Sequence, residues 1–287
     1  TSNYGNVLAT WTYSDSNLTA GLSTGSTYYI YSRGKDRAGN YEVAWTTVSV
    51  LCDKTAPTVV MLKPVPGSYG YYGVDDAANP LRKPLLVISG TATDSVSELS
   101  KVELRIKNLT ADPDVYYNGS GWVVNDSTWL VINSNLSSWS KSCPAWDDGV
   151  EYVVNARGED TAGNLSGMTT AQFLYDGTYP QVILSDPNAV YERRLVSISG
   201  TASDTDPDGA GGAKLASELS AAQAAVRRNY NSKWWDNINK TFTGDTEANA
   251  YYNVSSLVSG GWYVTGADSP TWVNGEAYLV KVRSVDT

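Results

Sequence analysis

The chain has 287 residues, a formal net charge of −9 and no histidine. Excess carboxylates make its surface unsuited to nucleic acid or anionic lipid, and the missing imidazole excludes Ser–His–Asp catalysis, Cys–His catalysis and histidine-based zinc sites. The 20 tyrosines and 10 tryptophans, against 2 phenylalanines, are typical of a β-rich, secreted protein. No apolar run approaches the ~20 residues of a membrane-spanning helix, so we expect no membrane insertion in this segment.

Three stretches of similar sequence define an internal repeat. Gly25 to Asn40 returns as Gly149 to Asn164, and a third copy runs from Gly275 to Asp286. The period of about 120 residues suits one β-sandwich. We therefore expect the C-terminal part of a first repeat (1–55), a complete repeat (56–177), and a third repeat that lacks its last strand (178–287).

Within each repeat the pattern is that of short strands. In the second copy Tyr152, Val154 and Ala156 alternate with more polar residues, the period-2 pattern of a half-buried strand. Asp160 to Asn164 then supplies turn residues, and 168–175 can return as the hairpin partner. The other expected strands are, in chain order, 59–62, 85–93, 101–107, 121–124, 129–132 and 221–228, the last despite alanines that favour helix.

A tyrosine follows a glycine by three residues in all three copies. These tyrosines are Tyr28, Tyr152 and Tyr278. In immunoglobulin-like sandwiches, a tyrosine at the start of the penultimate strand bonds its hydroxyl to the upstream backbone, the tyrosine corner. We expect the same structural role here.

Further motifs recur at matching positions. Ser-Gly-Thr-Ala-x-Asp occupies 89–94 and 199–204, and Asp-x-Thr-x-Pro occupies 53–57 and 176–180. Together with the Gly-x-x-Tyr…Arg…Asp-x-Ala-Gly-Asn segment, they resemble the tandem bacterial immunoglobulin-like repeats of very large surface proteins. The resemblance implies an all-β, elongated array of Greek-key sandwiches that is extracellular, non-enzymatic, and structural or adhesive. The expected partners are neighbouring repeats, copies of the chain arranged head to tail, or a cell surface. A spacer role beside an enzyme is a further alternative to the structural or adhesive role.

Aspartates gather at the expected ends of the sandwiches. Asp53, Asp94 and Asp160 should meet at one end of the second repeat, where they either bind Ca²⁺ or merely cap turns. In the third repeat, alternate carboxylates precede a glycine, a spacing that can wrap a loop around Ca²⁺, although Leu215 stands where an EF-hand has glutamate. A plain flexible loop is the alternative. The predicted calcium ligands of this repeat are Asp204, Asp206, Asp208, Asp176 and Asp286.

Paired aromatic residues in the third repeat suggest a second function. If these side chains form stacking platforms for sugar rings, the repeat is a glycan- or protein-binding module. The alternative is that they lie in strands and fill the core. The candidate binding residues are Trp234, Trp235, Tyr251 and Trp262.

The third copy stops at Asp286-Thr287, inside a motif that elsewhere continues into a final strand. We expect that strand to come from a continuing chain or from a neighbouring copy. We also expect Cys52 and Cys143 to be unpaired, since they belong to opposite ends of the second repeat.

Overall fold

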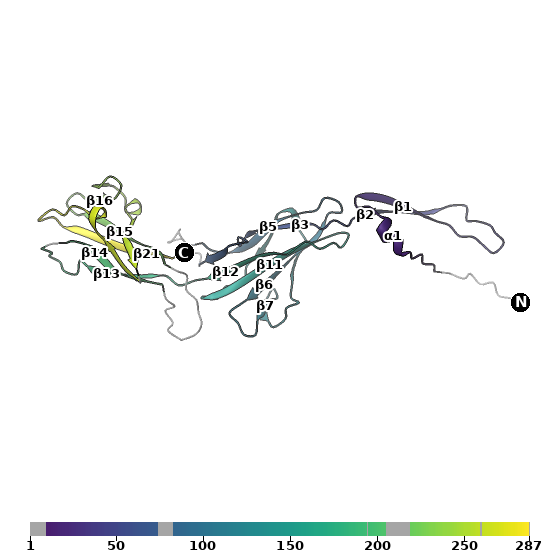
Figure 1. Ribbon diagram of the computed structural model, residues 1–287, viewed down its shortest axis with the longest axis horizontal. Helices are drawn as coiled ribbons and strands as arrows, with labels where there is room; N and C mark the ends of the chain where they lie inside the picture. The colour runs from purple at the N-terminus through teal and green to yellow at the C-terminus, as the bar shows by residue number, and fades with distance from the viewer. Residues whose placement is uncertain (1–9, 74–82, 194, 205–218, 259, 287) are drawn as a thin grey trace.

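The computed structural model describes residues 10–73, 83–193, 195–204, 219–258 and 260–286. The chain forms a hairpin unit and two β-sandwiches, which follow one another along the long axis (Figure 1). It is an almost all-β array of sandwich domains, as the repeat predicts. Among the described residues, no helix is long and apolar enough to cross a membrane.

The hairpin unit contains a short helix and two strands, α1 (Ser16–Gly21), β1 (Ser26–Ser32) and β2 (Thr46–Cys52). The strands pair antiparallel, from Ser26 opposite Cys52 to Ser32 opposite Thr46. Most of their side chains are exposed. This hairpin is the counterpart of the last two strands of the complete repeat.

The first sandwich packs a three-stranded sheet against a larger one. The smaller sheet has the order β10-β5-β3, and the larger has the order β4-β12-β11-β6-β7-β8, with β9 also on β6. The smaller sheet consists of β3 (Thr58–Lys63), β5 (Val87–Thr93) and β10 (Trp139–Ser142). The larger consists of β4 (Tyr69–Tyr72), β6 (Leu99–Asn108), β7 (Val115–Tyr117), β8 (Trp122–Val123), β9 (Leu130–Ile132), β11 (Val150–Asp160) and β12 (Thr169–Tyr175), with the 3₁₀ turn η1 (Leu136–Ser138) between β9 and β10.

The second sandwich repeats this arrangement. One sheet has the order β13-β14-β20-β19; the other has the order β17-β16-β15-β18, with β21 on the free side of β15. The first sheet consists of β13 (Gln181–Asp186), β14 (Ile198–Ser203), β19 (Ser256–Val258) and β20 (Gly261–Val264). The second consists of β15 (Leu219–Arg228), β16 (Lys233–Asp236), β17 (Thr241–Gly244), β18 (Tyr252–Asn253) and β21 (Tyr278–Asp286), accompanied by the 3₁₀ turns η2 (Glu247–Asn249) and η3 (Gly266–Asp268).

The alanine-rich stretch 219–228 is a strand, as expected. Ala222, Ala224 and Val226 are buried on the core side of β15, so the packing of the sandwich outweighs the helix preference of alanine.

The repeated Ser-Gly-Thr-Ala motif has a packing explanation. A Cβ on Gly90 would collide with the backbone carbonyl of Val60 and the ring of Trp139. A Cβ on Gly200 would meet the carbonyl of Ile183 and the ring of Trp262 in the same way. Each sandwich therefore places a buried tryptophan ring over a glycine in the strand beside it.

Candidate metal centre

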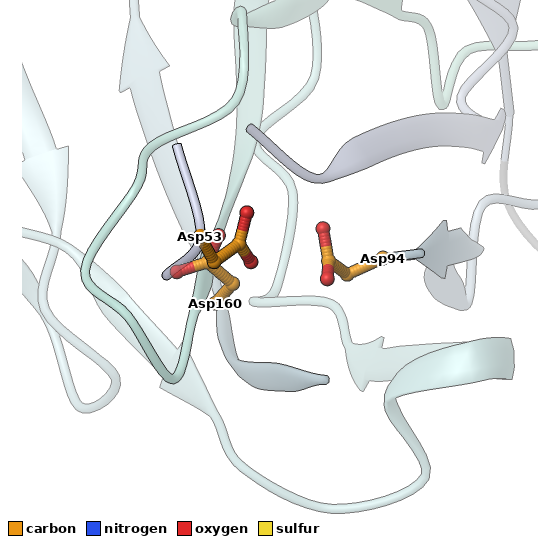
Figure 2. A group of neighbouring side chains, drawn as sticks. All are labelled: Asp53, Asp94 and Asp160. Carbon is orange, nitrogen blue, oxygen red and sulfur yellow. The ribbon is translucent and has the colours of Figure 1, made fainter. Parts of the chain in front are cut away.

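Three carboxylates converge where the hairpin unit joins the first sandwich (Figure 2). Asp53 lies between β2 and β3, Asp94 directly follows β5, and Asp160 ends β11. One oxygen from each lies within 4.8 Å of the others. The residues thus come from three segments far apart in sequence, and they are the set expected at this end of the second repeat.

Local turns hold each carboxylate in place. Asp160 Oδ1 accepts the backbone N–H groups of Ala162 and Asn164, both at 2.9 Å. Asp94 Oδ1 accepts hydrogen bonds from the backbone N–H groups two and three residues later in the chain, at 2.9 and 2.8 Å. Asp53 Oδ1 accepts the N–H of Thr55 at 2.8 Å. Turn capping therefore occurs, but it uses only one oxygen of Asp53 and of Asp94.

The remaining oxygens carry the signal for a cation. Asp53 Oδ2 and Asp94 Oδ2 are buried and have no hydrogen-bond partner among the described residues, and Ser97 Oγ is in the same situation. Asp160 itself is 1% exposed. Buried anionic oxygens without donors are costly, and a cation between them removes that cost. An all-oxygen donor set suits Ca²⁺, whereas zinc sites are built mainly from nitrogen and sulfur ligands.

Asp53 is held in its ionised form. The nearby Ser97 hydroxyl lowers the pKa of Asp53, although it forms no hydrogen bond of normal geometry. The Thr55 N–H and the Thr24 hydroxyl also lower this pKa, whereas desolvation of the carboxylate raises it. Thr24 Oγ1 lies 3.3 Å from Asp53 Oδ1. Because Thr24 belongs to the hairpin unit and Ser97 to the first sandwich, both sides of the joint favour the charged aspartate.

The linker also forms hydrogen bonds with the units on both sides of it. Lys54 donates its N–H to Thr24 Oγ1 at 3.1 Å and its Nζ to the carbonyl of Leu22 at 2.5 Å. From the other side, Asn164 Nδ2 donates to the carbonyl of Asp53 at 3.2 Å. Residues 53 and 54 are thus fastened to the turn before β1 and to the turn after β11.

The second joint uses related contacts. Asp176 is 4% exposed and its Oδ1 accepts the N–H of Thr178 at 2.9 Å, as Asp53 does with Thr55. Asp148 occupies the position in the repeat that corresponds to Thr24. It accepts hydrogen bonds from the N–H of Gly177 and from the hydroxyl of Thr178, the latter at 2.7 Å. Asp204 follows β14, the counterpart of β5. Asp206, Asp208 and the side chain of Asp286 lie outside the described residues, so the calcium site of the third repeat stays a prediction.

The three tyrosines that follow a glycine by three residues each accept a backbone hydrogen bond from the residue five positions earlier. The donors are the N–H groups of Ser23 to Tyr28 at 2.8 Å, of Asp147 to Tyr152 at 3.0 Å, and of Val273 to Tyr278 at 3.0 Å. This is the geometry of the tyrosine corner.

The candidate aromatic platform is largely core. Trp234 and Trp235 are each 5% exposed, because adjacent strand residues point to opposite faces and both faces of β16 are covered. Trp262, in β20, is 2% exposed and belongs to the same core cluster as Trp235. Tyr251 is half-buried under Arg283, whose guanidinium carbon is 4.0 Å from the ring centroid. An open stacking surface built from these four rings is therefore not present. Both cysteines are free thiols.

Similarity of the chain to known proteins is found among solved structures. No family model matches it, and no curated protein matches it. Among solved structures, the chain resembles the chicken CNTN1 FN1–FN3 domains with 12% identity over 92% of this chain and 72% of that one, at a TM-score of 0.38. It resembles fibronectin(III)-like modules of Clostridium thermocellum CbhA with 18% identity over 70% and 80%, at a TM-score of 0.31. A third similar structure, Bacteroides uniformis beta-glucuronidase 3, has 12% identity over 82% of this chain but 25% of that one, at a TM-score of 0.24. With TM-scores this low, we transfer no activity or partner from these proteins.

Proposed function

We propose that this chain is a stiff, non-enzymatic structural or adhesive segment of a large extracellular bacterial surface protein, and that Ca²⁺ locks its joints. The observation that supports the proposal best is the set of buried, unpartnered oxygens of Asp53 and Asp94 beside Asp160. They lie at a joint, where a ligand fixes the angle between successive units, rather than in a cleft open to a substrate.

The chemistry of the site explains how a cation would stiffen the chain. Ca²⁺ takes about six to eight oxygen ligands, so three carboxylates supply part of the shell and carbonyls or water supply the rest. Asp53 belongs to the linker, whereas Asp94 and Asp160 belong to the sandwich. One ion bound to all three therefore couples the linker to two turns of the first sandwich and restricts rotation at residues 53 to 57.

We extend the proposal to the second joint. Asp176, Asp204 and Asp286 occupy the corresponding sequence positions, and Asp206 and Asp208 add carboxylates shortly after Asp204 in the sequence. Two calcium-dependent joints in series would give an array whose extension depends on the ion.

The partner proposed for the open edge of β21 is another repeat or another copy of the chain. Among the described residues β21 pairs with β15 alone, whereas its counterpart β11 pairs with both β6 and β12. The second edge of β21 can accept a strand from a neighbouring repeat or a head-to-tail copy. Light scattering across a concentration series tests the latter, and a strictly monomeric chain would argue against it.

The calcium proposal is tested by melting the full chain with excess chelator, with millimolar Ca²⁺ and with equal Mg²⁺. A ligand that binds only the folded state stabilises it by about 2.7 kcal/mol at a hundredfold excess over Kd, so we expect a higher melting temperature in Ca²⁺. Asp94→Asn should remove the part of this gain that comes from the first joint. Asp36→Asn is the control, because Asp36 also closes a turn, accepting hydrogen bonds from Asn40 as Asp160 does from Asn164, but lies in the hairpin tip, away from the cluster.

Small-angle scattering on the same samples tests the mechanical part of the proposal. We expect the wild-type chain to have a narrower distribution of maximum dimensions in Ca²⁺ than in chelator, and Asp53→Asn to reduce this difference to the contribution of the second joint. Calcium-independent melting and scattering in the wild type would contradict the proposal at both joints. A calcium response that is undiminished in Asp94→Asn but disappears in Asp94→Asn/Asp206→Ala would assign the ion to the second joint alone.

A further inference from the structure

A groove in the second sandwich has the features of a small-ligand site. It has a volume of about 340 Å³ and runs between the β16–β17 hairpin and the segment from η2 to β18. Ligand pockets range from about 300 to 1,000 Å³, so this one suits a small molecule. It lies away from the joints that carry the proposed function.

The chemistry of its walls favours a neutral, hydroxylated ligand. Asn237, Asp245 and Asn249 supply amide and carboxylate groups, and Tyr251 adds a half-buried ring. Among the described residues that line the groove there is no lysine or arginine, which disfavours an anion. Both carboxylates of the lining are already engaged, which weakens the attraction for a cation. Asp245 pairs with Lys233, and Asp236 Oδ1 accepts the backbone N–H groups of Ile238 and Asn239.

Two residues in the lining carry polar atoms that lack partners. Trp235 is 5% exposed and Tyr252 is 9% exposed, and neither Trp235 Nε1 nor Tyr252 Oη has a hydrogen-bond partner among the described residues. Buried donors of this kind are costly in a folded protein. Both atoms are closed off from solvent, so a ligand recovers this cost by accepting their hydrogen bonds when the side chains turn toward the groove. Burial, and then the charge of Asp268, raises the pKa of Tyr252, so its hydroxyl stays protonated and able to donate.

From the groove, its polar lining whose carboxylates are already engaged, and these two unpartnered groups, we propose that the second sandwich binds a neutral saccharide. Sugar hydroxyls both donate and accept, which matches a wall of carboxylate and amide groups beside indole and phenol donors. Binding takes place in the groove beside η2, not on an open platform of Trp234 and Trp262, which belong to the core.

The experiment is saturation-transfer NMR on the full chain with millimolar maltose, cellobiose, lactose and chitobiose, and with choline and inorganic phosphate as contrasting probes. We expect at least one disaccharide to give a signal and neither contrasting probe to do so. Tyr252→Phe and Asn249→Ala should weaken that binding about tenfold. Tyr230→Ala removes a ring that is 81% exposed outside the groove and should leave the binding unchanged.

Two measurements keep the result interpretable. Tyr252→Phe should melt no lower than wild type without ligand, because it removes a buried hydroxyl that has no partner. Asp94→Asn should bind the saccharide normally, which separates this proposal from the calcium joint. The proposal is overturned if no disaccharide binds, if binding is equal in wild type, Tyr252→Phe and Asn249→Ala, or if choline alone gives the signal, which would identify a cation site.

Discussion

Asn164 fastens the first sandwich to Asp53 in the linker before it: its Nδ2 donates to the backbone carbonyl of Asp53 at 3.2 Å and to Asp160 Oδ2 at 2.8 Å. One amide therefore closes the turn after β11, orients a carboxylate of the candidate metal centre, and holds the linker against the sandwich. The final asparagine of the Asp-x-Ala-Gly-Asn motif serves the joint as well as the turn.

Asn164→Ala should loosen this joint. Loss of both side-chain hydrogen bonds is expected to cost about 1–2 kcal/mol and to increase proteolytic cleavage near residues 53–57. Asn40→Ala is the control, because Asn40 makes the same bond to Asp36 in the hairpin tip. Limited proteolysis with mass spectrometry checks the prediction. Equal cleavage of the linker in both variants would show that Asn164 does not secure it.

Gly90→Ala should destabilise the first sandwich strongly. The added methyl group would collide with the backbone of Val60 and with the buried Trp139 ring, and a well-packed core cannot accommodate both, so we expect a loss of about 3 kcal/mol or more. Gly121→Ala is the control, since its Cβ would meet no atom within 4 Å. Urea denaturation monitored by tryptophan fluorescence measures the difference. A wild-type midpoint for Gly90→Ala would refute the packing explanation of the repeated motif.

Tyr152→Phe should isolate the contribution of the tyrosine corner. The ring is fully buried and packs on Trp146 with centroids 4.7 Å apart, so phenylalanine keeps the packing while the N–H of Asp147 loses its acceptor. We expect a loss of about 1–2 kcal/mol in urea denaturation, with an unchanged slope. Tyr28→Phe, in the exposed hairpin unit, should cost less. An equal, negligible effect of both substitutions would mean that the hydroxyl has no stabilising role.

Glu103 should make stability depend on pH in the acidic range. It is 7% exposed; burial alone would raise its pKa, but Lys101 at 2.8 Å and Arg157 at 2.7 Å outweigh burial and lower it. Because the folded-state pKa is below the unfolded value of about 4.3, the stabilisation is fully present above pH 4.3 and is lost as pH falls through the folded-state pKa.

Melting curves between neutral pH and pH 2.5 check this. We expect Glu103→Gln to be less stable than wild type at neutral pH and the gap to narrow steadily below about pH 4.3. Glu192→Gln is the control for the loss of a carboxylate at an exposed position. A gap between wild type and Glu103→Gln that is constant with pH would contradict the assigned shift.

Much of the fold was predictable because its determinants are local. Alternating residues in 152–156, the glycine before Tyr152 and the Asp160–Asn164 turn act within a few positions of one another, so their patterns identify strand, corner and turn directly. Repetition of these patterns predicts the number and order of the units. It also indicated which aspartates belong at one end of a sandwich.

Tertiary structure decided what depends on residues distant in sequence. Asp53, Asp94 and Asp160 are separated by tens of residues, and only the pairing of β3, β5 and β11 with their neighbours brings their oxygens within 4.8 Å and leaves two of them without donors. Whether Trp234 and Trp235 stack on a ligand or fill the core likewise depends on whether both faces of β16 are covered, and both are. Composition and spacing specify which side chains are available, whereas burial and unmet hydrogen bonds arise only when separate segments pack together.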